Sequence, residues 1–225
     1  IQSLAGPDAP VQALLHQVQQ AWYLRQHDPV QSAQAVLAAQ AMLANEDLVL
    51  PTTARIRTQA RLLLVQAESH WLQADFETAQ ALAHDALALD NTVDDQTVHA
   101  DANFLLSQVH SNNGNLTQRD ACLERAVDAA TLGQDSERID FLEATQARYA
   151  SLRDTRQALV RWGQRFSTTP QNLQPSVAPA EHNFLGTIKY NTGHFAEALQ
   201  HLNLCFEGAC ETGQIVTAVT AAVNA

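Results

Sequence analysis

The stretch from Leu185 to Cys205 reads LGTIKYNTGHFAEALQHLNLC, and it decides the fold. Its small and apolar residues stand at the spacing of two helices joined by a tight turn: Gly186, Gly193, Phe195, Ala198, Leu202 and Cys205. Glycine marks the turn because it readily adopts the left-handed backbone that ends a helix. The apolar residues after the turn recur every three or four positions, which is typical of a half-buried helix. The stretch therefore predicts a helical hairpin.

The same template recurs twice more in the chain. It fits Ala67, Ala74, Phe76, Ala79, Ala83 and Ala86, and it fits Ser107, Gly114, Leu116, Leu123 and Ala126. The residues expected at the small position after each turn are Ala33, Ala79, Arg119, Ala158 and Ala198, and they lie 46, 40, 39 and 40 positions apart. An array of such hairpins offers an extended surface and no single cleft for chemistry, so the pattern favours binding over catalysis.

Five hairpins are expected, over residues 9–44, 52–89, 94–132, 134–166 and 178–212, with the start of a further helix over 214–225. Asp28 is expected to cap a helix whose first residue is Pro29. The predicted fold class is all-α: a right-handed superhelical array of antiparallel helical hairpins that forms a single domain over 1–225. The absence of an initial Met and the uncapped helical pattern at the end indicate a fragment of a longer protein. The segment from Ser167 to Pro179 is interpreted as a spacer, or alternatively as a hinge.

Composition excludes several classes of protein. Hydrophobic residues make up 46% of the 225 residues, with 8 Gly and 7 Pro, and the formal net charge is −11. An apolar run of about 18 residues, which a membrane span needs, is missing. Nucleic acid is a poor partner because no segment before Ser151 is basic, and phosphate binding needs clustered cations. Three cysteines are too few for a disulfide framework, which favours a cytoplasmic protein; an extracytoplasmic location after signal-peptide removal is the alternative.

The quoted positions resemble the tetratricopeptide repeat. Leu185, Gly186, Gly193, Phe195, Ala198, Leu202 and Cys205 meet most of that family's pattern, whereas Gln146, Arg153, Thr155 and Arg165 depart from it. The resemblance implies a TPR-like α-solenoid in which the first helix of each hairpin lines the concave face. Repeats of about forty residues are similar to those in the regulatory regions of bacterial signalling proteins, including diguanylate cyclases and large transcription regulators.

No catalytic residue, metal ligand or cofactor is expected. His201 and Cys205 lie four apart on one helix face, with His194 nearby, but the sequence supplies no further ligand pair at metal-binding spacing. We therefore interpret Cys205 as a packing residue. The sequence also lacks a nucleophile elbow, a phosphate loop and a dinucleotide fingerprint.

The predicted partner-binding groove mixes aromatic side chains with amides and charges. The template assigns to it Trp22, Arg25, Arg61, Glu68, Trp71, Asp101, Phe104, Gln108, Ser111, Asn112, Asp140, Glu143, Asn183, Thr187, Tyr190 and Asn191. Aromatic side chains can anchor an extended peptide while amides bind its backbone. Because the carboxylates surround the aromatic residues, we expect a neutral or basic partner segment with an apolar anchor.

The sequence thus predicts a non-catalytic protein-binding or peptide-binding module in the sensing or regulatory region of a larger signalling protein. The alternative is a small-molecule effector-binding superhelical domain of a transcription regulator. A homodimer is left open. The basic stretch from Arg148 to Arg165 is interpreted as a solvated helix face, with contact to an anion or a partner domain as the second interpretation.

Overall fold

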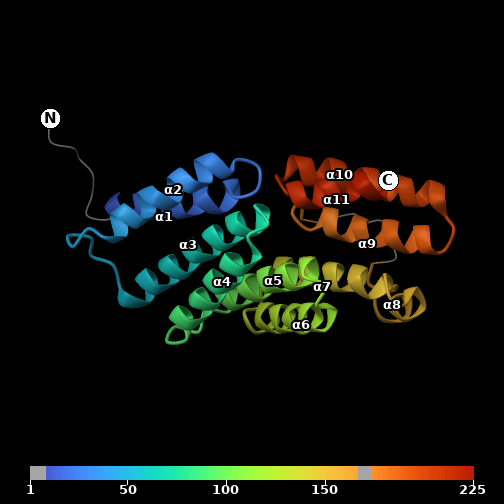
Figure 1. Cartoon of the computed structure of the whole chain (residues 1–225), viewed down its shortest axis with the longest axis horizontal. Coiled ribbons are helices and arrows are strands. Elements are labelled where there is room, and N and C mark those ends of the chain that lie inside the picture. The colour runs from blue at the N-terminus through green and yellow to red at the C-terminus, as the bar shows by residue number, and fades with distance from the viewer. Residues whose placement is uncertain (1–8, 167–173) are drawn as a thin grey trace. The chain divides into compact units, whose positions relative to one another are not determined.

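The structure is a computed structural model that describes residues 9–166 and 174–225. Every regular element in these ranges is an α-helix (Figure 1). The helices are α1 (Ala9–Leu24), α2 (Pro29–Leu43), α3 (Thr52–Leu72), α4 (Phe76–Asp90), α5 (Gln96–Asn112), α6 (Leu116–Leu132), α7 (Ser136–Ser151), α8 (Thr155–Trp162), α9 (Ala178–Asn191), α10 (Phe195–Glu211) and α11 (Ile215–Asn224). The predicted all-α class is confirmed. Among the described helices, none is long and apolar enough to cross a membrane.

The chain divides into two compact units, and the division falls inside α6. Unit 1 is Ile1–Cys122 and unit 2 is Leu123–Ala225. Each unit is described by itself below. Residues 167–173 of the expected spacer lie outside the described residues.

Five of the turns between the described helices close in the same way, and three of these are turns of the sequence template. The residue at the glycine position of the template has a positive φ: 62° at Ala74, 71° at Gly114 and 83° at Gly193. The next residue in each turn then donates its backbone N–H to a carbonyl five positions back, as from Asp75 to His70 at 2.9 Å. This bond satisfies a carbonyl that the helix end would otherwise leave unpaired. The residue at this template position is small because a left-handed backbone favours glycine and is strained for residues with larger side chains.

Aspartate caps the helix that follows several of these turns. Asp28 accepts the backbone N–H of Gln31 at 3.0 Å, and Pro29 is the first residue of α2, so the predicted cap is confirmed. Asp75 and Asp154 cap α4 and α8 in the same way. Such a cap pairs a backbone N–H that has no partner inside the helix.

The position four residues after the cap is buried, and this corrects the alignment of the first hairpin. Ala79 and Ala158 occupy it after Asp75 and Asp154, and both are fully buried. After Asp28 the same position is Ser32, not Ala33: Ser32 is 3% exposed and donates its hydroxyl to the carbonyl of Ala21 at 2.8 Å, whereas Ala33 is exposed. The sequence analysis aligned the hairpins on the alanine after each turn. A buried serine whose hydroxyl is hydrogen-bonded fits the position equally well.

Arg119 occupies the same position in α6 and is buried there. Its guanidinium is paired with the adjacent Asp120 through hydrogen bonds of 2.9 and 2.8 Å. The position therefore accepts a large charged residue because its charge is compensated.

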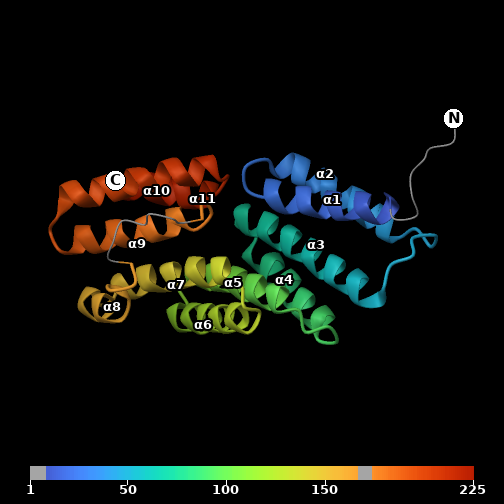
Figure 2. The same ribbon diagram turned by 180° about the vertical axis from the view of Figure 1, so that it is seen from behind.

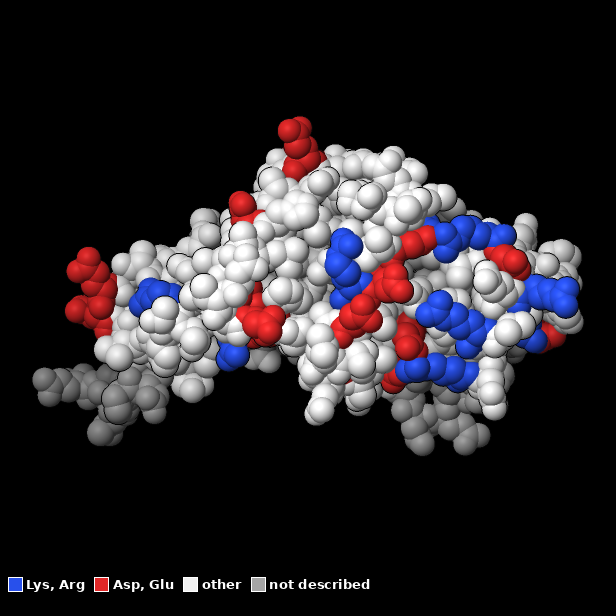
Figure 3. All heavy atoms as spheres, turned by 90° about the horizontal axis from the view of Figure 1, so that it is seen from below, with Lys and Arg blue, Asp and Glu red and all other residues white. Residues whose placement is uncertain are grey.

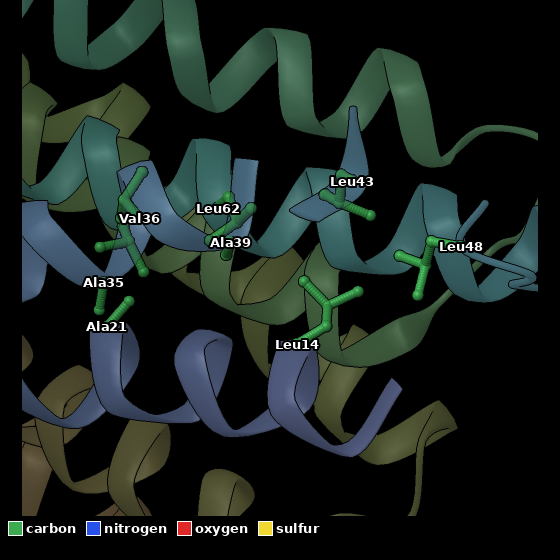
Figure 4. Close-up of a cluster of buried hydrophobic side chains, with 9 residues drawn as sticks. Leu14, Ala21, Ala35, Val36, Ala39, Leu43, Leu48 and Leu62 are labelled. Atoms are coloured by element: carbon green, nitrogen blue, oxygen red, sulfur yellow. The ribbon is translucent and has the colours of Figure 1, made fainter. Parts of the chain in front are cut away.

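The core of unit 1 lies between consecutive helices. The helix α1 packs on α2 and α3, and α3 packs on α4 and α5. Figure 4 shows the cluster in which Leu14 and Ala21 of α1 face Ala35, Val36, Ala39 and Leu43 of α2, with Leu62 of α3 beside them. The fully buried alanines allow the helix backbones to approach closely, so larger side chains would separate them.

Unit 2 repeats this arrangement. The helix α9 packs against α7 and α10, and α10 packs against α11; Figure 2 shows α9 and α10 running beside each other from the reverse side. A Cβ atom on Gly186 of α9 would lie 2.9 Å from Cγ of Leu202 on α10. Glycine at this position therefore permits the close packing of the best-matched hairpin.

Candidate functional site

The first helices of the hairpins in unit 1 contact one another in succession: α1 contacts α3, and α3 contacts α5. Most of the predicted groove residues of this unit lie on these three helices or directly after them. We call the surface formed by Trp22, Arg25, Gln26, Arg61, Glu68, Trp71, Asp101, Phe104, Gln108 and Asn112 the first-helix face. All of these side chains are partly exposed except Asn112, which is exposed.

Two guanidinium groups lie over the ring of Trp22 on this face. Cζ of Arg25 is 4.0 Å from the centroid of the Trp22 ring, and Cζ of Arg61 is 3.3 Å from it. Arg25 also donates to the carbonyl of Trp22 at 2.6 Å. Cation–π contacts of this kind contribute about 0.5–2 kcal/mol each, more where water is excluded. The two arginines therefore fix the orientation of the indole.

Each of these arginines has a carboxylate partner on the next first helix. Arg25 Nε pairs with Glu68 Oε2 of α3 at 2.6 Å, and Arg61 of α3 pairs with Asp101 of α5. Gln26 adds a second hydrogen bond to Glu68, at 2.6 Å. The side chains of Arg25 and Glu68 are 24% and 12% exposed, so water screens this pair only in part. The network links α1, α3 and α5.

A second link joins α3 to α5 at their carboxyl ends. The indole N–H of Trp71 donates to Asn112 Oδ1 at 2.8 Å. Phe104 and Gln108 lie on the same helix as Asn112, two turns and one turn before it respectively, and both are partly exposed. The two tryptophans of the face are thus held by polar contacts while part of each remains accessible.

The network corrects the expected charge of the face. The sequence analysis treated Glu68, Asp101, Asp140 and Glu143 as an acidic surround. In unit 1, Glu68 and Asp101 are each paired with an arginine of the same face. In unit 2, Arg165 pairs with both Asp140 and Glu143. The first-helix face therefore carries two positive and two negative side chains and is electrically balanced.

The predicted groove residues of unit 2 do not form an open polar surface. Asn183 and Thr187 of α9 are 6% and 9% exposed, and the Thr187 hydroxyl donates to the carbonyl of Asn183 at 2.8 Å. Their burial contradicts their assignment to an accessible groove. The template gives the angular position of a residue on its helix, but it does not show what covers that side of the helix.

Tyr190 and Asn191, at the end of α9, are exposed as expected. The Tyr190 ring packs edge-to-face on Phe195, with ring centroids 5.6 Å apart. Asn191 donates its amide to the carbonyl of Ser151 at 3.1 Å and to the hydroxyl of Thr155 at 3.0 Å. Asn191 therefore ties α9 to the turn between α7 and α8.

The basic stretch is interleaved with acidic and aromatic groups. Arg161 lies over the ring of Trp162, with Cζ 4.3 Å from its centroid, and Arg165 Nη2 pairs with Asp140 at 2.5 Å. Figure 3 shows Lys and Arg side chains beside Asp and Glu over the right-hand part of the view, where α7 and α8 lie. The pairing of Arg165 weakens the case for a purely solvated or anion-binding face.

Sequence reasoning missed two notable groups. Gln26 lies four positions after Trp22, a spacing that could have placed it on the same face. Glu181 of α9 is 6% exposed. Burial, together with the charge of Asp140, raises the pKa of the Glu181 carboxyl to about 7, although Arg165 acts in the opposite direction. Its position three residues before Phe184 was the signal of its burial.

Cys205 is fully buried, as predicted, and burial raises the pKa of its thiol to about 12. A thiol with this pKa is protonated at neutral pH and is a poor nucleophile and metal ligand. Within residues 9–166 and 174–225, no group of three or more His, Cys, Asp or Glu side chains is placed to hold a metal ion.

No family model matches this chain, and no curated protein matches it. The resemblance to the tetratricopeptide repeat accordingly rests on the residues quoted above.

Proposed function

We propose that unit 1 is a non-catalytic binding module that holds an extended segment of a partner protein on the first-helix face. The observation that carries this proposal is the fixed position of two partly exposed tryptophans. Trp22 is held by Arg25 and Arg61, and Trp71 is held by Asn112. Side chains that are already ordered lose little conformational entropy when a partner binds, so more of the contact energy appears as affinity.

The composition of the face defines the chemistry of the segment. Aromatic rings provide contact area for an apolar side chain, and amide groups such as Gln108 and Asn112 are suited to peptide backbone groups. Since the two ion pairs balance their own charges, the face offers no strong attraction to a highly charged segment. The proposed partner is neutral or weakly basic with one apolar anchor, and its affinity should depend only modestly on salt.

A selection from a random peptide library against the full chain tests this proposal. The selected peptides should share an apolar residue and should not be enriched in acidic residues. Fluorescence anisotropy with a labelled selected peptide then compares wild type with Trp71→Ala and Phe104→Ala. Each substitution should weaken binding by at least about tenfold, because aromatic anchors contribute about 2 kcal/mol or more.

Tyr23→Ala provides the matched control. Tyr23 is the neighbour of Trp22 on α1, is 66% exposed, and lies about 100° from Trp22 around the helix axis. Its removal should leave the affinity unchanged, and circular dichroism should show that all three variants remain helical. Equal affinity of wild type, Trp71→Ala and Phe104→Ala would place the binding surface elsewhere, with the Arg148 to Arg165 stretch as the next candidate.

A further inference from the structure

Two histidines of unit 2 face each other across the α9–α10 hairpin. Nδ1 of His182 lies 3.1 Å from Nδ1 of His201, and the ring centroids are 5.3 Å apart. Both side chains are partly exposed. The close packing of Gly186, one turn after His182 on α9, against Leu202, the residue after His201 on α10, fixes the distance between the two backbones. The pair is therefore held by two packed helices rather than by a mobile loop.

Both rings favour the neutral form, which is the form that binds metal ions. Burial lowers the pKa of His182, and the nearby charge of His201 lowers it further. Burial also lowers the pKa of His201, where Lys189 lowers it and Glu197 raises it. Lys189 and Glu197 are themselves paired at 2.5 Å.

The separation of the two nitrogens matches that of two ligands on one metal ion. With metal–nitrogen bonds of about 2.0–2.1 Å, adjacent nitrogens lie about 3.3 Å apart in a tetrahedral site and about 2.9 Å apart at a right angle. The observed 3.1 Å lies between these values. A hydrogen bond between two neutral rings accounts for the same distance, so the two arrangements can exchange with little movement of the helices.

We propose that His182 and His201 form a two-nitrogen site for a late first-row divalent cation, with Cu²⁺ bound more tightly than Zn²⁺. Imidazole nitrogen suits both ions, and Cu²⁺ forms the more stable complexes with a given set of nitrogen ligands. The buried, protonated thiol of Cys205 does not take part. Since the described residues offer no group of three His, Cys, Asp or Glu ligands, water completes the coordination. The sequence analysis paired His201 with Cys205 and did not consider His182.

Calorimetric titration of the full chain with Cu²⁺ tests the site, with glycine present as a competing chelator to suppress weak surface binding. One ion per chain should bind to wild type. His182→Ala and His201→Ala should each weaken binding by about 100-fold or more, because losing a ligand costs more than the 10- to 100-fold typical of losing a ligand's hydrogen-bonded partner. His84→Ala is the matched control, since His84 is exposed on α4 and should not contribute.

A second measurement uses only wild type, so it does not depend on the folding of the variants. Cu²⁺ is paramagnetic, and substoichiometric amounts should broaden the NMR signals of the His182 and His201 rings before those of the other histidines. Zn²⁺ should raise the melting temperature of wild type, because an ion that binds only the folded state stabilises it. Simultaneous broadening of all histidine signals, or full Cu²⁺ affinity in both alanine variants, would overturn the proposal.

Discussion

Trp71 of α3 donates its indole N–H to Asn112 of α5 at 2.8 Å, which joins the carboxyl ends of two consecutive first helices. Trp71 precedes the last residue of α3, and Asn112 is the last residue of α5. Nearer the amino ends, Arg61 and Asp101 join the same two helices. Two separate polar contacts thus fix both the distance and the angle between α3 and α5.

The contact between Trp71 and Asn112 should contribute measurably to stability. Asn112→Ala and Trp71→Phe each remove the hydrogen bond, and each is expected to lower the free energy of unfolding by at least about 0.5–1.5 kcal/mol. Urea denaturation of the full chain measures the effect. Because both substitutions remove the same bond, the double variant should lose less than the sum of the two single losses. If the loss of unfolding free energy in the double variant equals the sum of the two single losses, the hydrogen bond is not formed in solution.

The ion pair of the first-helix face should be stronger than an ion pair at the exposed surface. A double-mutant cycle on Arg25 and Glu68 is expected to give a coupling energy of about 1–2 kcal/mol. The matched control is Arg57 and Asp95, at 2.9 Å, because the Arg57 side chain is 55% exposed. That pair should give about 0.5 kcal/mol or less, since water screens it. Similar coupling energies would contradict the view that partial burial strengthens the network.

The small positions after the turns should not tolerate larger side chains. Ala79 and Ala198 are 0% and 2% exposed, and each lies four residues after the residue that precedes its helix. Replacing either by Leu should destabilise the protein by about 1–3 kcal/mol through overpacking. Ala81→Leu and Ala196→Leu serve as controls because both alanines are exposed on the same helices. Unchanged denaturation midpoints for Ala79→Leu and Ala198→Leu would refute the assigned register.

Glu181 should make stability depend on pH near neutrality. Its pKa in the folded chain is about 7, above the ordinary 4.5, so the folded state binds the proton more tightly than the unfolded state. The stabilisation that follows is fully present below about pH 4.5 and is lost as the pH rises through 7. Glu181→Gln should therefore stabilise the chain at pH 8 and have little effect at pH 4.5. Thermal melts of wild type and Glu181→Gln across this pH range measure the difference in stability. If the melting temperatures of the two proteins change with pH in parallel, the pKa of Glu181 is not shifted.

The sequence was informative about local structure because caps and turns are local. Asp28 with Pro29, and the breaks near Ala74, Gly114 and Gly193, all lie where helices begin or end. The error at Ala33 arose because residue size alone was used, whereas the distance from the cap identifies Ser32. Helical angle likewise predicted that Trp22, Arg61 and Asp101 share a face.

The sequence pattern did not predict which side chains of different helices contact one another. Nothing in the spacing shows that Arg25 reaches Glu68, 43 positions later, and so the face was expected to be acidic rather than balanced. The burial of Asn183 and Thr187 was missed for the same reason, because a single helix does not reveal its neighbours. His182 and His201 meet only because α9 and α10 pack at a particular register.

The exposure of the cysteines has a practical consequence. Cys122 and Cys205 are buried, whereas Cys210 near the end of α10 is exposed. A maleimide dye should therefore react with Cys210 well before the other two thiols, without any engineering of the chain. The label would then report from α10, 98 positions along the chain beyond Asn112, the last residue of the first-helix face.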